Sequence, residues 1–392
     1  MRIVHIQDYF HPMLGYQETF LPREQAKLGH EVYVVTSDRY KPLVYDNNRN
    51  LFGERIVGAR FSIEEGVKVW RLKTLFEIPH EIWMLGLERK IRELKPDVVI
   101  VHGIVNSSAL RIARLKKKLG NFRLIYDDHM TFEASRSKFK MLYPLFKWMF
   151  SSLIQKTADA LVGVSNTSKM FMHKKYGIPL EQIIVIPLGA DDESFRFNAT
   201  TRREVRSELS LSGGDIVFVY AGKIIPVKGP HLLVEAGVKL MRSYDNLKVI
   251  LVGNGRQDYV EGMKQHIKRE GLEDRFIWHD AVQNKDLSKL YSASDVAVWP
   301  REASLSMLEA MACGLPVIIS DSSEVTERVG RNNGLTYRGN DTSSLAQQME
   351  KLLDPGLIMK MGRNGRKFVE EECSWRVIAK QFIELAIKPR EK

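Results

Sequence analysis

Two lysines in the second half of the chain have the charge and the spacing to bind an anion. Lys223 and Lys228 both follow the apolar run Ile216–Tyr220, which predicts a buried strand. At about 4 Å and an effective dielectric constant near 20, each ammonium group would lower the energy of a unit negative charge by ~4 kcal/mol before desolvation is subtracted. Lysines at a strand end are also common as solvated surface, so a second anion-binding feature is needed to assign them a function.

A short helix downstream supplies that feature. Ser306 and Glu309 form a Ser-x-x-Glu pattern, which predicts the start of a helix with a capping box, shortly after an apolar run of strand type. The free backbone N–H groups near Ser304, Leu305 and Ser306, together with the positive end of the helix, would favour a phosphate group. On the four-residue pattern alone, Ser306 and Glu309 could equally do no more than cap one another.

Two histidines follow predicted strands of the first half. His102 ends the run 97–101, and His129 comes shortly after the run 122–126. Side chains just past parallel strands lie at the carboxyl edge of the sheet, where α/β proteins bind ligands. Both histidines are therefore candidates, although a histidine at a strand end is more often an ordinary polar residue.

The stretch 296–319, VAVWPREASLSMLEAMACGLPVII, resembles the donor-sugar signature of the retaining family 4 glycosyltransferases, which have the GT-B fold. The resemblance implies that Glu309 binds the ribose hydroxyls of a nucleotide sugar, that Glu302 faces the sugar, and that N–H groups at the helix end hold the diphosphate. Family members usually have seven residues between the two glutamates, whereas six separate Glu302 from Glu309, and Arg301 takes the expected position. Either the loop is one residue shorter and Glu302 still serves, or that role is altered.

The resemblance extends to other positions, some of them with departures. Lys223 and Lys228 match the two cations that bind the donor diphosphate, but the first is usually arginine, so Lys223 keeps the charge and loses the bidentate geometry. His129 matches a histidine that points at the donor sugar. Gly15 stands alone where relatives usually have two adjacent glycines near the donor phosphate and the acceptor. Two positions are implied to lie beside the nucleotide and its base: Gly253 and Val282.

The chain has the length and the pattern of two α/β domains. It has 392 residues, of which 44% are hydrophobic and 27% charged, as in ordinary globular proteins. Strand and helix signals alternate in both halves, which predicts a parallel sheet in each. We expect a Rossmann-like acceptor-binding domain over residues 1–190 and a Rossmann-like nucleotide-sugar-binding domain over residues 191–372. The GT-B resemblance implies that they face one another across a cleft and that a helix over residues 373–392 packs back on the first domain.

Local patterns add detail to these domains. The first βαβ unit lacks the G-x-G-x-x-G fingerprint, which argues against a nicotinamide or flavin dinucleotide site. We expect a hairpin around residues 67–72, a helix over residues 80–94 and a loop at Gly334.

The positive charge is concentrated in the first half. The net charge is +11, of which residues 1–190 contribute +10, and residues 101–150 alone hold ten basic against three acidic side chains. Such a patch fits nucleic acid, an anionic lipid or a phosphorylated substrate. Two cysteines are too few for a disulfide framework, the first apolar run is too short for a signal peptide, and no run of eighteen apolar residues occurs. We therefore expect a cytoplasmic location.

The stretch 138–156 combines aromatic side chains with lysines and has no acidic residue. This composition is typical of a helix that lies on a membrane surface, and equally of a core helix with a basic outer face; Pro144 interrupts it. The first alternative predicts a peripheral protein on the inner face of an anionic membrane. Nucleic acid is less well supported, because no helix-turn-helix, zinc-ligand or RNA-binding sheet signature accompanies the charge.

The combined expectation is a retaining, metal-independent glycosyltransferase without a cofactor. No two aspartates are separated by a single residue, so the metal-binding Asp-x-Asp motif of the other large glycosyltransferase fold is absent. The resemblance implies transfer from a nucleotide-diphosphate sugar to a hydroxyl acceptor, such as a lipid-linked or cell-envelope glycan, with attack on the face from which the diphosphate leaves. Two rivals remain: a nucleotide-sugar epimerase of the same fold, and a non-catalytic membrane or nucleic-acid adaptor, which Arg301 and the lone Gly15 favour.

Overall fold

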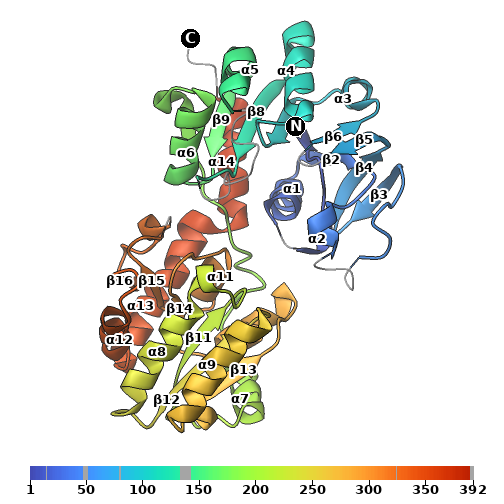
Figure 1. Ribbon diagram of the computed structural model, residues 1–392. Helices are drawn as coiled ribbons and strands as arrows, with labels where there is room; N and C mark the ends of the chain where they lie inside the picture. The colour runs from blue at the N-terminus through green and yellow to red at the C-terminus, as the bar shows by residue number, and fades with distance from the viewer. Residues whose placement is uncertain (15, 47–51, 79–80, 133–142, 324, 389–392) are drawn as a thin grey trace. The chain divides into compact units, whose positions relative to one another are not determined.

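The computed structural model describes residues 1–14, 16–46, 52–78, 81–132, 143–323 and 325–388. The chain divides into two compact units, of which the first comprises residues 1–188 and 375–392 and the second residues 189–374. Each unit holds one large, mainly parallel sheet with helices packed around it (Figure 1). The predicted fold class, with two Rossmann-like units, is confirmed.

The sheet of the first unit has the strand order β10-β9-β8-β7-β1-β2-β4-β3. Its central strands are near-continuous apolar runs because helices cover both faces of the sheet. All described strand pairs of this sheet are parallel except β3 with β4. The bounds are β1 (Arg2–Ile6), β2 (Glu31–Ser37), β3 (Arg60–Glu64), β4 (Val67–Leu72), β7 (Val98–His102), β8 (Arg123–Asp128), β9 (Ala160–Gly163) and β10 (Ile183–Val185). A separate hairpin joins β5 (Thr74–Ile78) to β6 (Glu81–Met84).

The helices of the first unit lie on both faces of this sheet. Their bounds are α1 (Gln17–Lys27), α2 (Pro42–Asp46), α3 (Leu87–Leu94), α4 (Ser107–Leu119), α5 (Tyr143–Thr157), α6 (Asn166–Phe171) and α14 (Trp375–Ile387). Alternate residues of one strand face different helices: in β1, Val4 belongs to the cluster with α4 and α5, whereas Ile3 belongs to the cluster with α14.

The sheet of the second unit is parallel throughout its described strand pairs, in the order β13-β12-β11-β14-β15-β16. The strand bounds are β11 (Ile216–Ala221), β12 (Leu247–Val252), β13 (Phe276–His279), β14 (Val296–Trp299), β15 (Val317–Ser320) and β16 (Gly334–Tyr337). The helix bounds are α7 (Ala199–Glu208), α8 (Pro230–Met241), α9 (Gln257–Arg269), α10 (Leu287–Ala293), α11 (Ser306–Ala312), α12 (Thr342–Lys351) and α13 (Pro355–Phe368).

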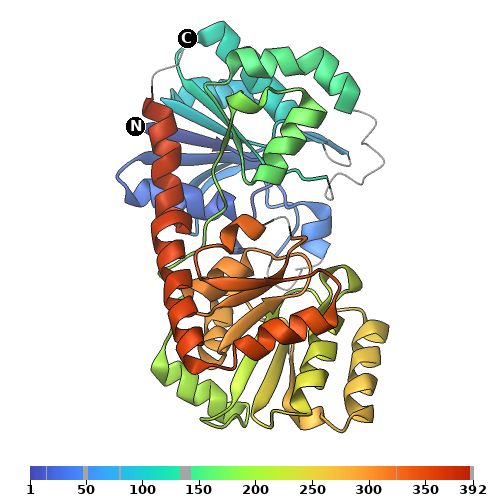
Figure 2. The same ribbon diagram turned by 90° about the vertical axis from the view of Figure 1, so that its left-hand side faces the viewer.

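The last helix, α14, packs on the first unit, as the resemblance implied. Trp375 is 3% exposed and its ring stacks on that of Phe20 in α1, with ring centres 5.7 Å apart. Further along the helix, the carbonyl group of Leu385 accepts a hydrogen bond from Arg123 in β8 (3.1 Å). Figure 2 shows α14, in red, beside the blue amino-terminal segment of the same unit.

Three local predictions have clear outcomes. The hairpin around residues 67–72 is confirmed, because β3 and β4 pair antiparallel. The helix over residues 80–94 is wrong in its first part, where Glu81–Met84 forms β6 and pairs with β5; only Leu87–Leu94 is helical. The loop at Gly334 is also wrong, because Gly334 begins β16. Among the described residues, no helix is both long and apolar enough to cross a membrane.

Candidate active site

The predicted donor-binding residues of the second unit gather at one place in its sheet. The chain builds β11, β12 and β13 in one direction and then returns to place β14 on the other side of β11. This reversal makes the carboxyl ends of β11 and β14 a topological switch point, where open α/β sheets bind ligands. Lys223 and Lys228 follow β11, and Glu302 lies in the loop after β14.

Lys228 and Glu302 form an ion pair. The Nζ atom of Lys228 lies 2.9 Å from Oε2 of Glu302, and the two side chains are 25% and 36% exposed. Lys228 ends the short 3-10 turn Pro226–Lys228, after which Gly229 takes a left-handed conformation (φ +72°) and α8 begins. Two predicted site residues from distant parts of the chain therefore meet. The side chain of Lys223 is exposed, and its carbonyl group accepts a hydrogen bond from the hydroxyl group of Tyr220 (2.7 Å).

Arg301, which takes the position expected for the first glutamate, has a different environment. Its guanidinium group donates to the carbonyl oxygen of Pro226 (2.5 Å) and to the side chain of Asn340 (2.8 Å). It also packs so closely on Gly229 that a Cβ atom there would lie 2.9 Å from its Cγ. Arg301 thus supports the turn that carries Lys228, and Glu302 is the residue that reaches the lysine.

The predicted capping box at α11 is wrong. Leu305, not Ser306, is the residue before the helix, its dihedral angles are helical (φ −56°, ψ −30°), and no side chain caps the helix. Ser306 is the first helical residue, so its hydroxyl group points elsewhere: it donates to the carbonyl of Ala221 at the end of β11 (3.3 Å) and contacts the hydroxyl group of Ser304 (2.6 Å). The segment 304–306 is therefore hydrogen-bonded to the carboxyl end of β11.

Glu309 is a buried carboxylate on α11. It is 7% exposed, and its Oε1 atom accepts a hydrogen bond from the side chain of Asn284 (2.8 Å). Burial raises the pKa of Glu309 to about 7; the hydrogen bond from Asn284 offsets part of this rise, and the charge of Asp191 adds to it. A carboxylate with this environment gains from any ligand that donates hydrogen bonds to it.

The two positions implied to lie beside the nucleotide follow β12 and β13. Gly253 directly follows β12 in the left-handed region (φ +139°), and a Cβ atom there would lie 1.9 Å from the carbonyl oxygen of Gly222. Only glycine fits this close approach of two strand ends. Val282 is half-buried in the loop after β13.

In the first unit, His129 lies beside a buried carboxylate, Asp127. The His129 ring is 41% exposed, and its Nε2 atom is 3.5 Å from Oδ2 of Asp127, which is fully buried. Asp127 also contacts Nδ1 of His102 (3.0 Å) and accepts a hydrogen bond from Gln17 at the start of α1 (2.7 Å). These residues come from β7, β8 and α1, at the carboxyl edge near the point where the strand order reverses between β1 and β7.

The network continues through His5 of β1. The Nδ1 atom of His5 lies 3.0 Å from Nε2 of His102, and its Nε2 atom lies 2.7 Å from Oε1 of Gln25. Burial, with the neighbouring His102, lowers the pKa of His5 to about 3, so His5 is neutral at pH 7. Sequence patterns did not identify His5 or Asp127 as parts of a site, since His5 falls within an apolar run.

The charges in this network lower the pKa of Asp127 and raise the pKa of His129. Burial acts to raise the pKa of Asp127, but the charges and hydrogen bonds of His102 and His129 outweigh it, and the pKa lies below its usual range. Burial acts to lower the pKa of His129, but the hydrogen bond and charge of Asp127 outweigh it, and the pKa is raised. Asp127 therefore contacts His129 and is the main group that raises its pKa.

The same residues form a candidate metal cluster within the described part of the chain. His102, Asp127 and His129 each offer one ligand atom, and these atoms lie within 4.8 Å of one another. Imidazole and carboxylate ligands suit zinc and other divalent transition metals. The hydrogen bonds among them account for the same geometry without an ion. Gly15, the remaining predicted site residue, lies outside the described residues, as do residues 138–142 of the predicted membrane stretch.

Comparisons with known proteins match glycosyltransferases along most of the chain. Residues 21–194 match the family model described as Glycosyltransferase Family 4, and residues 201–368 match that described as Glycosyl transferases group 1. An uncharacterised glycosyltransferase of Methanocaldococcus jannaschii is 23% identical over 91% of this chain and 89% of its own length. A GDP-mannose-dependent alpha-(1-6)-phosphatidylinositol monomannoside mannosyltransferase of Mycobacterium tuberculosis is 27% identical over 58% of this chain and 61% of its own.

Other curated relatives are matched over only about half of their length. Among solved structures, HepE from Anabaena in complex with UDP superimposes with a TM-score of 0.73 and 17% identity, over 98% of this chain and 99% of that one. At this identity, the likeness shows a shared fold.

Proposed function

This chain belongs to the family 4 glycosyltransferases of the GT-B fold, and we propose that it transfers a sugar from a nucleotide-diphosphate sugar to a hydroxyl group, with retention of configuration. One observation carries the proposal: Lys228 and Glu302 meet at the switch point of the second sheet, in the loops that follow β11 and β14. A cation and a carboxylate at this edge suit a diphosphate and a sugar hydroxyl, respectively.

The diphosphate of the donor would bind to Lys228 and to the backbone N–H groups of residues 304–306. Lys228 is already held at the edge of the sheet by the turn that Arg301 supports, so little side-chain entropy is lost when a phosphate replaces or joins Glu302 as its partner. Lys223 lies exposed after the same strand and adds a second cation. These groups would stabilise the charge that develops on the leaving diphosphate.

The nucleoside and the sugar would be held by other residues of the proposed site. Glu309 would accept hydrogen bonds from the ribose hydroxyls, and Gly253 and Val282 would lie beside the nucleotide. Glu302 would orient the sugar, and the family resemblance implies the same role for His129. We propose that the reaction needs no metal ion, because the cations above supply positive charge and the Asp-x-Asp motif is absent from the sequence. The acceptor hydroxyl would then attack the face that the diphosphate leaves, and the leaving phosphate would take up its proton.

We propose that the acceptor is a glycan or a glycolipid and that the enzyme works at a membrane surface. A phosphatidylinositol mannoside is named for one relative, and the HepE structure was determined with UDP, so both GDP- and UDP-sugars are candidate donors. The basic first half of this chain favours a location on the anionic inner face of a membrane.

A donor panel with a matched pair of variants tests the proposal. UDP-, GDP- and ADP-sugars are scored first by thermal shift of the wild-type protein, and the donor that binds is then used in a transfer assay. Lys228→Ala is expected to lower transfer by a factor of 100 or more while the protein stays folded, since a transition-state charge loses its cation. Lys360→Ala, which removes an exposed lysine of α13 in the same unit, is expected to have no effect.

The outcome separates the rivals. Unchanged transfer by Lys228→Ala would refute the diphosphate contact. Absence of binding to every nucleotide sugar would favour an adaptor, and turnover of the donor without any acceptor would favour an epimerase. The environment of Arg301 gives the adaptor less support than the sequence did, because Glu302 reaches Lys228 despite the shift in spacing.

A further inference from the structure

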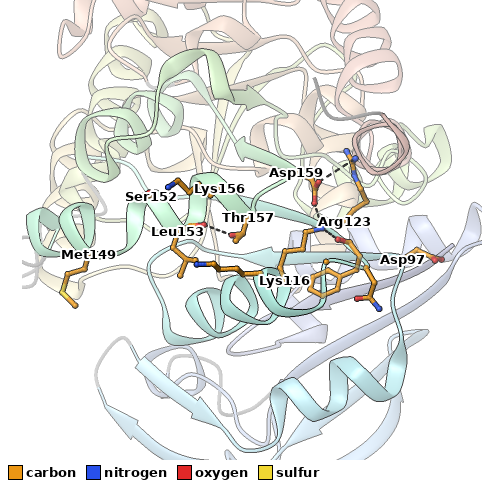
Figure 3. A pocket seen from close by; sticks show the side chains of 13 residues that line it. Asp97, Lys116, Arg123, Met149, Ser152, Leu153, Lys156, Thr157 and Asp159 are labelled. Carbon is orange, nitrogen blue, oxygen red and sulfur yellow. Dashed lines mark hydrogen bonds and ion pairs between the residues drawn. The ribbon is translucent and has the colours of Figure 1, made fainter. Parts of the chain in front are cut away.

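A second site lies on the opposite edge of the first sheet from His129. A cavity of about 1020 Å³ opens there at the amino ends of β7, β8 and β9, between the last turns of α4 and α5 (Figure 3). Its size is at the upper end of the range for small-molecule sites, roughly 300–1,000 Å³. Four cations line it: Lys116, Lys117, Arg123 and Lys156.

A buried carboxylate fixes two of these cations. Asp159 is 3% exposed in its side chain, and its carboxylate lies 3.1 Å from Nζ of Lys116 and 3.9 Å from the guanidinium group of Arg123. Figure 3 shows Asp159 and Arg123 facing one another at one end of the cavity. The other two lysines of the lining, Lys117 and Lys156, are exposed. Four cations against the two carboxylates of the lining, Asp97 and Asp159, leave an excess of positive charge.

An exposed apolar stripe runs along α5 toward this cavity. Leu145, Trp148 and Met149 are 49%, 81% and 49% exposed, and Lys156 follows on the same side of the helix about two turns later. The opposite side of α5, with Phe146 and Ile154, is buried in the core. Met149 itself lines the cavity (Figure 3), so the stripe reaches the basic cavity.

We propose that this surface binds the face of an anionic phospholipid bilayer, with the phosphate group of one lipid in the basic cavity. Trp148 would lie at the level of the headgroups, where the amphipathic indole ring is favoured, and Leu145 and Met149 would enter the boundary of the acyl chains. Lys117 and Lys156 would reach lipid phosphates while their stems cover apolar surface. This inference adds a lipid site to the proposed membrane location, and it uses none of the residues proposed to bind the donor.

Vesicle flotation of the full-length protein tests it. Wild-type protein is expected to float with vesicles of phosphatidylcholine and phosphatidylglycerol, to stay in solution with phosphatidylcholine alone, and to detach at high salt. The double variant Lys117→Glu/Lys156→Glu and the single variant Trp148→Ala are each expected to lower the partition coefficient about tenfold or more. Trp148→Phe is expected to float almost normally but to lose most of the quenching of tryptophan fluorescence by brominated lipid.

Matched controls lie on the second unit. Met359→Ala and Lys360→Glu change an exposed apolar and an exposed basic side chain of α13, and neither is expected to alter flotation. The thermal shift by the donor is expected to be unchanged in every variant, so a failure of the lipid site and a failure of the proposed activity are distinguishable. Equal flotation with neutral vesicles, flotation unaffected by the lysine reversals, or displacement by inorganic phosphate or nucleic acid at low concentration would overturn the proposal.

Discussion

Replacement of Glu309 by glutamine should stabilise the second unit at alkaline pH and weaken donor binding at the same time. The pKa of this carboxyl group is raised by burial from 4.5 to about 7, so the folded state holds a proton that the unfolded state releases between these pH values. The wild-type protein therefore loses stability as the pH rises through this window, and the loss persists above it. At 1.36 kcal/mol per pKa unit the total is about 3 kcal/mol, of which roughly 2–3 kcal/mol falls between pH 5 and pH 8.

Glu309→Gln removes this dependence. The glutamine keeps an oxygen that can accept the hydrogen bond from Asn284, but its buried amide nitrogen needs a partner and can cost about 1–3 kcal/mol at any pH. Because this cost is the same at both pH values, it drops out when the stabilities at pH 5 and pH 8 are compared. Relative to wild type, the variant should thus gain roughly 2–3 kcal/mol on going from pH 5 to pH 8. Urea unfolding followed by hydrogen exchange in α11 would measure this for the second unit alone.

Donor binding should change in the opposite sense. If the ribose hydroxyls donate to the ionised carboxylate, wild-type affinity should rise about tenfold between pH 6 and pH 8, since only a tenth of Glu309 is ionised at a pH one unit below its pKa. Affinity of Glu309→Gln should be lower and independent of pH. Glu204→Gln, at an exposed position of α7, is the control. The burial argument would be refuted if the free energy of unfolding of Glu309→Gln differed from that of wild type by the same amount at pH 5 and at pH 8. Unchanged donor affinity would refute the ribose contact.

Three further substitutions test other parts of the structure. Asp127→Asn should lower the pKa of His129, because burial remains and the neighbouring charge is gone; histidine NMR titration measures the shift, and an unchanged midpoint would contradict the contact. Gly253→Ala should destabilise the second unit by roughly 2–4 kcal/mol, since its Cβ atom would meet the carbonyl group of Gly222 in a left-handed conformation; thermal unfolding checks this, with Gly262→Ala, at an open position of α9, as control. Trp375→Ala should cost about 3–5 kcal/mol and raise hydrogen exchange throughout α14, because the ring is buried against Phe20.

Strands whose residues are buried on both faces could be predicted from the sequence almost to the residue. Leu247–Val252 and Val296–Trp299 are short, continuous apolar runs, and both form central strands with the predicted bounds. The stretch Glu81–Met84 differs from the predicted helix because a four-residue strand of a separate hairpin has too few residues to show a period of two. Its partner, β5, is what makes it a strand, and pairing of this kind is not encoded in local periodicity.

Local patterns do not encode contacts between distant segments, and for this reason the candidate site was predicted only in part. Single residues at strand ends were identifiable, because any parallel sheet brings its carboxyl ends to one edge. Which of them touch depends on loop geometry: Arg301, in the expected place of a glutamate, is hydrogen-bonded to the carbonyl group of Pro226, and Glu302 forms the ion pair with Lys228. A carboxylate thus meets the lysine although the register of the sequence moved by one residue. A position-by-position comparison with the motif finds arginine where a glutamate is expected. The ion pair between the two loops shows that a cation and a carboxylate nevertheless meet at the edge of the sheet.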